Sequence, residues 1–252
     1  MSYLGIDIGT SGVKAVVFSE TGQILSSAHQ EYPTYSLQPG WFDLDPHEVV
    51  ASSKAVISKV SAKVRNSDSV RSIGISSQGE AFTVLDKDDK FLCNAMVSFD
   101  TRSQKQVCEF TEIFGAERLY NITGHSAHTI FSVFKILWLK ENQPQLFARI
   151  KRLLCFGDLL GYELTGKAAI SYNLAGRTML FDVRMLEWSD EILYAIGLDK
   201  SALSEALPAG YPIGNLKKDI AGELGLGSDV IVTTGGHDQS CGAVGVGAAS
   251  SG

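Results

Sequence analysis

Residues 4–18 combine an acid, glycines and hydroxyl side chains at a spacing that suits phosphate binding. Two apolar runs flank the sequence Gly-Thr-Ser-Gly, which predicts a β-hairpin. Gly9 and Gly12 allow the backbone of this turn to approach an anion closely, and Thr10 and Ser11 add hydroxyl donors. Phosphate is therefore the ligand that the turn is predicted to bind.

Asp7 and Lys14 place opposite charges beside this turn. Lys14 attracts a phosphate, whereas Asp7 repels a bare one, so we expect a hydrated Mg²⁺ between Asp7 and the phosphate. Asp7 is thus the candidate metal residue, acting through water. The alternative is an ordinary two-strand turn with an incidental acid, because an isolated Asp-x-Gly-Thr sequence is short.

The second candidate site lies at residues 232–245, where Asp238 follows an expected strand and precedes a helix of small residues. An α/β sheet places reactive groups at such a position. Helix capping is the alternative role of Asp238, but capping does not explain Gly235 and Gly236, which leave room for a ligand beside the backbone. Gln239 and His237 adjoin Asp238, and His237 can contact a substrate.

Two further turns are polar and lie between expected strands and helices. Gln78, Gly79 and Glu80 join strands expected at 70–76 and 81–85, and an exposed turn is the alternative to a ligand site. Asp100 precedes a helix expected to end at Gly115. Asp100 is a second candidate for ligand binding. The alternatives are that it caps that helix or pairs with the nearby Arg102.

Composition excludes several classes of function. The chain has 252 residues, 44% of them hydrophobic, with a net charge of −6 and a pI near 5.4. This acidity argues against nucleic acid or an anionic membrane as partner. The four cysteines lack metal or disulfide spacing, and no apolar run reaches the ~20 residues that span a bilayer. We expect a soluble, cytoplasmic protein with a small-molecule partner.

The pattern of elements predicts an α/β fold with a mixed β-sheet flanked by helices. A third strand near 24–31 extends the hairpin into a meander, and Asp45 with Pro46 begins a helix whose apolar stripe faces the sheet. The next strand, at 70–76, completes a βαβ step. Farther along, we expect a helix at 129–141, a strand at 153–156 and a helix from 157 to 166. A polar loop is expected from 171 and a helix after Ser189. The last expected elements are a strand at 230–233, a turn at 235–239 and a helix at 240–247.

Residues 7–14 resemble the first phosphate motif of the superfamily of sugar kinases, actin and chaperone ATPases, and most closely its FGGY carbohydrate kinase branch. That branch includes xylulose, gluconate and glycerol kinases. The Gly-x-x-Asp-Gln sequence ending at Gln239 and the segment 172–179 are also similar to the branch. The resemblance implies a ribonuclease-H-like (actin-like ATPase) fold and ATP-dependent phosphorylation of a sugar or polyol hydroxyl.

The resemblance also implies a role for each candidate residue. Asp238 is the general base, ATP and Mg²⁺ are the cofactors, and a homodimer is possible. The substrate-binding residues are Gln78, Gly79, Glu80, Asp100 and Gln239, and the cofactor-binding residues are Asp7, Gly9, Thr10, Ser11 and Lys14. Phe99 departs from the tryptophan usual before Asp100, so the resemblance does not name the sugar.

The resemblance covers the chain but only the first half of the family's usual length. We expect residues 1–247 to form an N-terminal kinase domain and 248–252 to begin a connection to a C-terminal nucleotide-binding domain. The chain alone is then catalytically incomplete. Two alternatives remain open: an ATPase of the actin or chaperone type, and a non-catalytic sugar-binding relative.

Overall fold

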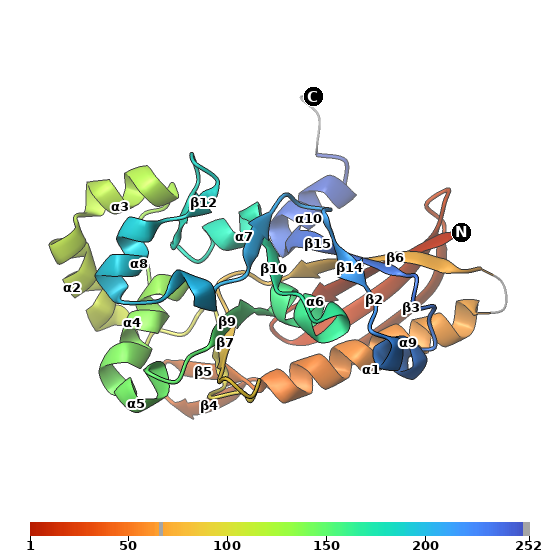
Figure 1. Ribbon diagram of the computed structural model, residues 1–252, viewed down its shortest axis with the longest axis horizontal. Coiled ribbons are helices and arrows are strands. Elements are labelled where there is room, and N and C mark those ends of the chain that lie inside the picture. The colour runs from red at the N-terminus through yellow and green to blue at the C-terminus, as the bar shows by residue number, and fades with distance from the viewer. Residues whose placement is uncertain (66–67, 249–252) are drawn as a thin grey trace.

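A six-stranded mixed sheet forms the centre of the computed structural model, which describes residues 1–65 and 68–248 (Figure 1). Its order is β14-β15-β6-β1-β2-β3. The β1–β6 and β6–β15 pairs are parallel and the other pairs are antiparallel. The strands are β1 (Ser2–Ile8), β2 (Gly12–Ser19), β3 (Ile24–Glu31), β6 (Val70–Ser77), β14 (Pro212–Asn215) and β15 (Ile231–His237). The expected mixed sheet is confirmed.

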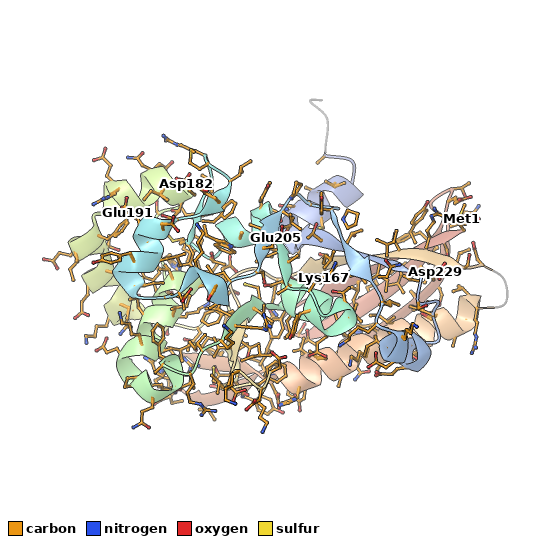
Figure 2. The ribbon with its side chains drawn as sticks, in the orientation of Figure 1. Met1, Lys167, Asp182, Glu191, Glu205 and Asp229 are labelled. Atoms are coloured by element: carbon orange, nitrogen blue, oxygen red, sulfur yellow. The ribbon has the colours of Figure 1, made fainter. Side chains whose placement is uncertain are left out.

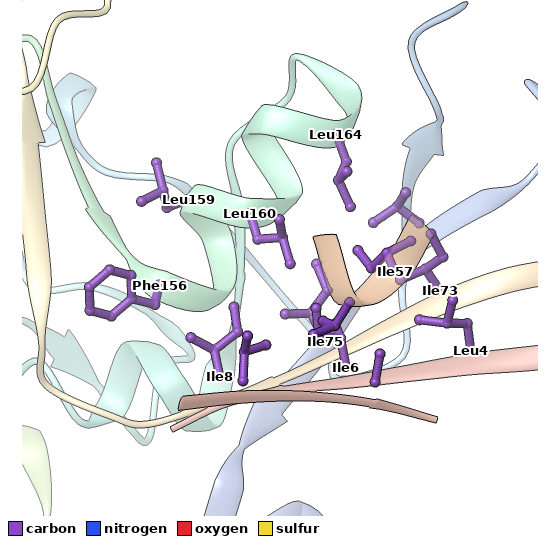
Figure 3. Close-up of a cluster of buried hydrophobic side chains, with 14 of the residues drawn as sticks. Leu4, Ile6, Ile8, Ile57, Ile73, Ile75, Phe156, Leu159, Leu160 and Leu164 are labelled. Carbon is purple, nitrogen blue, oxygen red and sulfur yellow. The ribbon is translucent and has the colours of Figure 1, made fainter. Parts of the chain in front are cut away.

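One face of this sheet is covered by helices. Alternate residues of β1, namely Leu4, Ile6 and Ile8, are buried on that face, as period-two strands require. Helices α1 (Pro46–Val64), α6 (Phe156–Thr165) and α9 (Lys218–Leu224) pack there. Figure 3 shows Ile57 of α1 and Leu160 and Leu164 of α6 pointing toward the strand side chains. The opposite face, which bears Asp7 and Lys14, is more open.

Helix α1 begins as expected. The Asp45 carboxylate accepts a hydrogen bond from the backbone N–H of His47 at 2.8 Å, and Pro46 is the first helical residue. Its predicted valine stripe is buried. Glu48 does not reach back to the start of the helix, because its carboxylate accepts from the Tyr35 hydroxyl at 2.8 Å.

A second hydrophobic cluster lies beside the sheet, among helices that gather at the left of Figure 1. It is built from α2 (Gln104–Phe114), α3 (Ala116–Thr123), α4 (Ser132–Asn142), α5 (Pro144–Phe147) and α8 (Asp190–Ile196). Helix α4 starts at Ser132 rather than at residue 129. The segment from 171 does not begin as a loop, because Ser171 ends β10 (Ala169–Ser171) and the short helix α7 (Tyr172–Gly176) follows directly.

Small two- and three-stranded sheets connect the two clusters. They pair β4 (Tyr35–Gln38), β5 (Trp41–Leu44) and β8 (Ala95–Met96); β7 (Phe82–Leu85) and β9 (Arg152–Cys155); β10 and β13 (Glu205–Leu207); and β11 (Phe181–Asp182) and β12 (Glu187–Trp188). A 3₁₀ turn covers Lys200–Ala202. In residues 1–65 and 68–248, no helix is both long and apolar enough to cross a membrane.

Strand β15 is longer than expected. It continues through Gly235 and Gly236 to His237, and α10 (Asp238–Gly245) follows directly, so the predicted turn at 235–239 is wrong. The pairing register of β15 with β6 shifts between Thr233 and Gly236. A Cβ on Gly235 would lie 1.7 Å from the carbonyl oxygen of Ile75, so this close approach of two strands requires glycine.

Candidate active site

A cavity of about 430 Å³ brings together residues from the two ends of the chain. Asp7 and Lys14 of the hairpin line it, as do Ser76 of β6 and Asp238 of α10. The carboxyl ends of the parallel strands β1, β6 and β15 meet here, the place where an α/β sheet binds ligands. At the amino ends of β1 and β6, Met1 and Asp229 border a separate cavity of about 560 Å³ (Figure 2).

Asp7 and Lys14 face each other across the hairpin. They are directly paired in the register of β1 and β2, and both side chains are exposed. The Ser76 hydroxyl donates a hydrogen bond to Asp7 Oδ1 at 2.8 Å. Across the described part of the chain, no three His, Cys, Asp or Glu side chains group closely enough to hold a metal by themselves. Magnesium takes one or two carboxylates with water and substrate phosphates, and the exposed Asp7 fits that donor set.

The turn of the hairpin is held in shape by Tyr32 and Gln78. The Tyr32 hydroxyl donates to the carbonyl oxygens of Gly9, at 2.5 Å, and Gly12, at 3.2 Å. The Gln78 amide donates to the same Gly9 oxygen at 3.1 Å and accepts from the Thr10 hydroxyl at 3.0 Å. Burial of Tyr32 raises the pKa of its phenol, so it remains a donor. Gln78 is therefore joined to the phosphate turn.

Asp238 is the first residue of α10, where the helix dipole stabilises a negative charge. Its side chain is 29% exposed. Oδ1 accepts from the backbone N–H of Gln239 at 2.7 Å and lies 3.1 Å from Nε2 of His237. Gln239 is exposed beside it. The carboxylate is thus placed at the helix start and also has open space before it.

Glu80 is buried and forms an ion pair with Arg177, whose side chain is half-buried. Glu80 has a φ of 62°, and its carbonyl oxygen accepts from the Ser132 hydroxyl at 2.7 Å. The Arg177 guanidinium also lies over the ring of Phe131, 4.9 Å from its centre. The sequence pattern at 172–179 indicated the segment of Arg177 but gave no sign of its partner, which lies 97 residues away.

Asp100 lies apart from this group, completely buried. Its carboxylate accepts from the backbone N–H groups of Phe42, at 2.7 Å, and Arg102, at 2.9 Å, and forms an ion pair with the Arg102 side chain. Arg102 also pairs with Asp43, and burial raises the pKa of that second carboxyl. Pairing with Arg102 is therefore confirmed, whereas the N-cap of α2 is Ser103. A substrate contact by Asp100 stays a prediction.

The structure thus brings most of the predicted site residues into one continuous region. Asp7, Lys14 and Asp238 line one cavity, Gln78 holds the phosphate turn, and Gly79 packs against the residue preceding Asp238. Sequence reasoning missed Tyr32 and Ser76, whose partners are distant in the sequence. It indicated the segment that contains Asn173 and Arg177, but not the partners of these two residues.

Known proteins provide an independent comparison. Residues 2–245 match the model of the FGGY family of carbohydrate kinases, N-terminal domain. A xylulose kinase from Lactococcus lactis subsp. lactis (strain IL1403) is 32% identical over 249 residues, which cover 98% of this chain and 50% of the relative. The crystal structure of a xyloylose kinase from Brucella ovis has 30% identity and a TM-score of 0.92, covering 97% of this chain and 50% of that one.

The crystal structure of Plasmodium falciparum glycerol kinase with ADP has 26% identity and a TM-score of 0.90, with 97% and 50% coverage. The expected actin-like fold is therefore confirmed. This chain spans about half the length of the relatives it matches. Since the family model matches nearly all of its residues, the chain belongs to the FGGY family of carbohydrate kinases.

Proposed function

We propose that the intact protein transfers the γ-phosphoryl group of ATP to a hydroxyl group of a sugar or polyol. One observation supports this most strongly: Asp7 and Asp238, 231 positions apart, line the same cavity. The reaction needs one acid near the phosphates and another near the attacking hydroxyl. A phosphate turn alone would serve an ATPase equally well, so Asp238 distinguishes the two functions.

Asp238 is the proposed general base. A sugar hydroxyl is a weak nucleophile at neutral pH, and a carboxylate that accepts its proton contributes on the order of 10²–10⁴-fold to the rate. The partial exposure of Asp238 leaves room for that hydroxyl, and its position at the start of α10 places the carboxylate in the wall of the cavity.

The hairpin is the proposed phosphate site. Backbone N–H groups of Thr10 and Ser11 in the Gly9–Gly12 turn, with the Ser11 hydroxyl, suit phosphate oxygens, and Lys14 adds a positive charge. The Thr10 hydroxyl and the Gly9 N–H donate within the protein, to Gln78 and to the Gly12 carbonyl oxygen, and so hold the shape of the turn. Asp7, fixed by the Ser76 hydroxyl, would hold hydrated Mg²⁺. A bound Mg²⁺ would neutralise charge that develops on the transferred group.

The substrate is proposed to lie between Asp238 and the Glu80–Arg177 pair. Glu80 oxygens accept and Arg177 nitrogens donate hydrogen bonds, which matches a chain of neighbouring hydroxyl groups. Gln239 is exposed at the same edge. The named relatives include xylulose and glycerol kinases. We therefore propose a short, neutral sugar or polyol as the substrate class.

Residues 1–247 are the proposed N-terminal domain, and the other half of the intact protein would supply the adenosine pocket. The proposed connection at 248–252 falls mostly on residues 249–252, which lie outside the described residues. The expected cytoplasmic location and homodimer stay predictions.

A kinase screen of the intact protein tests this proposal. ADP production would be measured with ATP and Mg²⁺ against pentuloses, hexonates and polyols, with no-sugar reactions as controls. We expect turnover that depends on one class of sugar, and none from the 252-residue chain alone. ATP hydrolysis that no sugar stimulates would instead support the ATPase alternative.

A further inference from the structure

Gly79 and His237 compete for one space beside Asp238. A Cβ placed on Gly79 would lie 3.0 Å from Cδ2 and 3.1 Å from Nε2 of the His237 ring, and 3.3 Å from Cβ of Arg177. Packed carbon atoms prefer separations of about 3.5–4.0 Å. A side chain at residue 79 would therefore press on the ring of His237, which would have to move by a few tenths of an ångström from its present position.

The backbone does not explain this glycine. Glu80, the next residue, has a φ of 62°, whereas Gly79 is absent from the positive-φ residues of the described chain. An alanine could adopt the conformation of residue 79 without strain. The absence of a side chain at residue 79 thus leaves a space, and the ring of His237 fills it.

His237 is held on several sides. Its backbone N–H donates to Oδ1 of Asn173 at 3.3 Å, and the Ser171 hydroxyl donates to the same oxygen at 2.7 Å. Its Nε2 lies 3.1 Å from Oδ1 of Asp238. The side chain is only 15% exposed, against 29% for Asp238. The backbone of His237 is therefore held by Asn173, its ring lies mostly buried between Gly79 and Asp238, and the carboxylate of Asp238 lines the open cavity.

We infer that His237 is a positioning residue for Asp238, and that Gly79 makes room for it. The ring limits the side-chain positions that the carboxylate can adopt and keeps Oδ1 on its side, so that the other oxygen faces the substrate. This inference rests on the proposed role of Asp238 as general base. A general base must lie within hydrogen-bond reach of its proton, so small displacements lower the rate of the chemical step.

A double-mutant cycle in the intact protein tests the inference. Gly79→Ala and His237→Ala should each lower kcat by about tenfold and leave KM nearly unchanged, because a misplacement near 1 Å can cost up to 10²-fold. The double variant should be no slower than His237→Ala, since a new methyl group at residue 79 has no ring to displace.

Gly222→Ala is the matched control, because a Cβ on Gly222 of α9 meets nothing within 4 Å. Melting temperatures of all variants would show whether any fails to fold. If Gly79→Ala costs the same factor with and without His237, residue 79 acts on the substrate or the fold directly and the inference is wrong. It is also wrong if His237→Ala leaves kcat unchanged. Wild-type protein without sugar-dependent turnover would instead refute the proposed function, and the inference with it.

Discussion

The acids at the edge of the central sheet and the acids in the interior have different partners. Asp7 and Asp238 each meet few protein donors and face one cavity. Asp100 is fully buried and has two backbone donors and an arginine, and Asp158 is buried beside Ser204. Carboxylates that line an open cavity are available to a ligand, whereas those buried in the interior maintain the fold.

The difference separates two turns that look alike in the sequence. The sequence predicts substrate binding both at Gln78–Glu80 and at the turn that contains Asp100. The first leads directly to the cavity residues through Gly79 and His237. In the second turn, Asp100 and Asp43 both form ion pairs with Arg102. The Arg102 guanidinium lies over the rings of Trp41 and Trp138. The following four substitutions test this division between edge and interior.

Asp100→Ala should have the largest effect, on stability. Removing one partner of a buried ion pair leaves the Arg102 charge buried without it, at a cost of about 3–5 kcal/mol in the free energy of unfolding. Urea unfolding of the chain measures this. Asp88→Ala is the control, since Asp88 is 55% exposed beside Lys87 and should change stability by less than about 0.5 kcal/mol. A small effect of Asp100→Ala would place Asp100 with the edge acids.

Asp158→Asn should change how stability depends on pH. Burial raises the pKa of the Asp158 carboxyl from 3.8 to about 7, while the hydrogen bond from Ser204 opposes that rise. A raised folded-state pKa means that the stabilising contribution is fully present below pH 3.8 and is lost as pH rises through about 7. Asparagine stays neutral, so the variant should gain on the order of 4 kcal/mol over the wild type at pH 8.

The measurement is a series of urea-unfolding curves from pH 4 to pH 8 for wild type and variant. The free energies of unfolding of wild type and variant should be nearly equal at pH 4, and that of the variant should become the larger toward pH 8. If the free energy of unfolding changes equally with pH in wild type and variant, burial does not raise the pKa of Asp158, and the comparison fails for this residue.

The sequence predicts those parts of the fold that depend on residues close together in the chain. The Gly-Thr-Ser-Gly hairpin, the Asp45 cap and the valine stripe of α1 depend on residues close in sequence, and each is found where expected. The path of β15 was missed because the irregularity that carries it through Gly235 depends on its pairing with β6, about 160 residues earlier.

The candidate site shows the same limit. Residue types and glycines indicated Asp7 and Asp238 separately, and the cavity that joins them depends on strand order. The Glu80–Arg177 pair and the burial of Asp100 could not be predicted, because charged residues in polar turns look the same whether water or an arginine surrounds them.

Asp238→Asn should have the third-largest effect, and on catalysis alone. Asparagine keeps the size of the side chain and can still serve a helix start, but it cannot accept the proton. We expect kcat of the intact protein to fall by about 10²-fold or more, with little change in melting temperature. Near-normal kcat would end the assignment of Asp238 as base, and a large loss of stability would place it with the interior acids.

Asp7→Ala should have the smallest of the four effects and the most specific one. The carboxylate is proposed to act through hydrated Mg²⁺, so its loss should lower turnover at limiting Mg²⁺ by about tenfold and leave sugar affinity nearly intact. Raising the Mg²⁺ concentration should restore part of the rate, because water and phosphates supply the other ligands.

The measurement is kcat as a function of Mg²⁺, together with sugar binding by calorimetry, for wild type and variant. Ser76→Ala is the matched control: it removes the hydroxyl that fixes Asp7 Oδ1 and keeps the charge, so its loss should be smaller. Equal loss of sugar binding in Asp7→Ala would mean that this exposed acid maintains the fold, and exposure would then not separate ligand acids from structural ones.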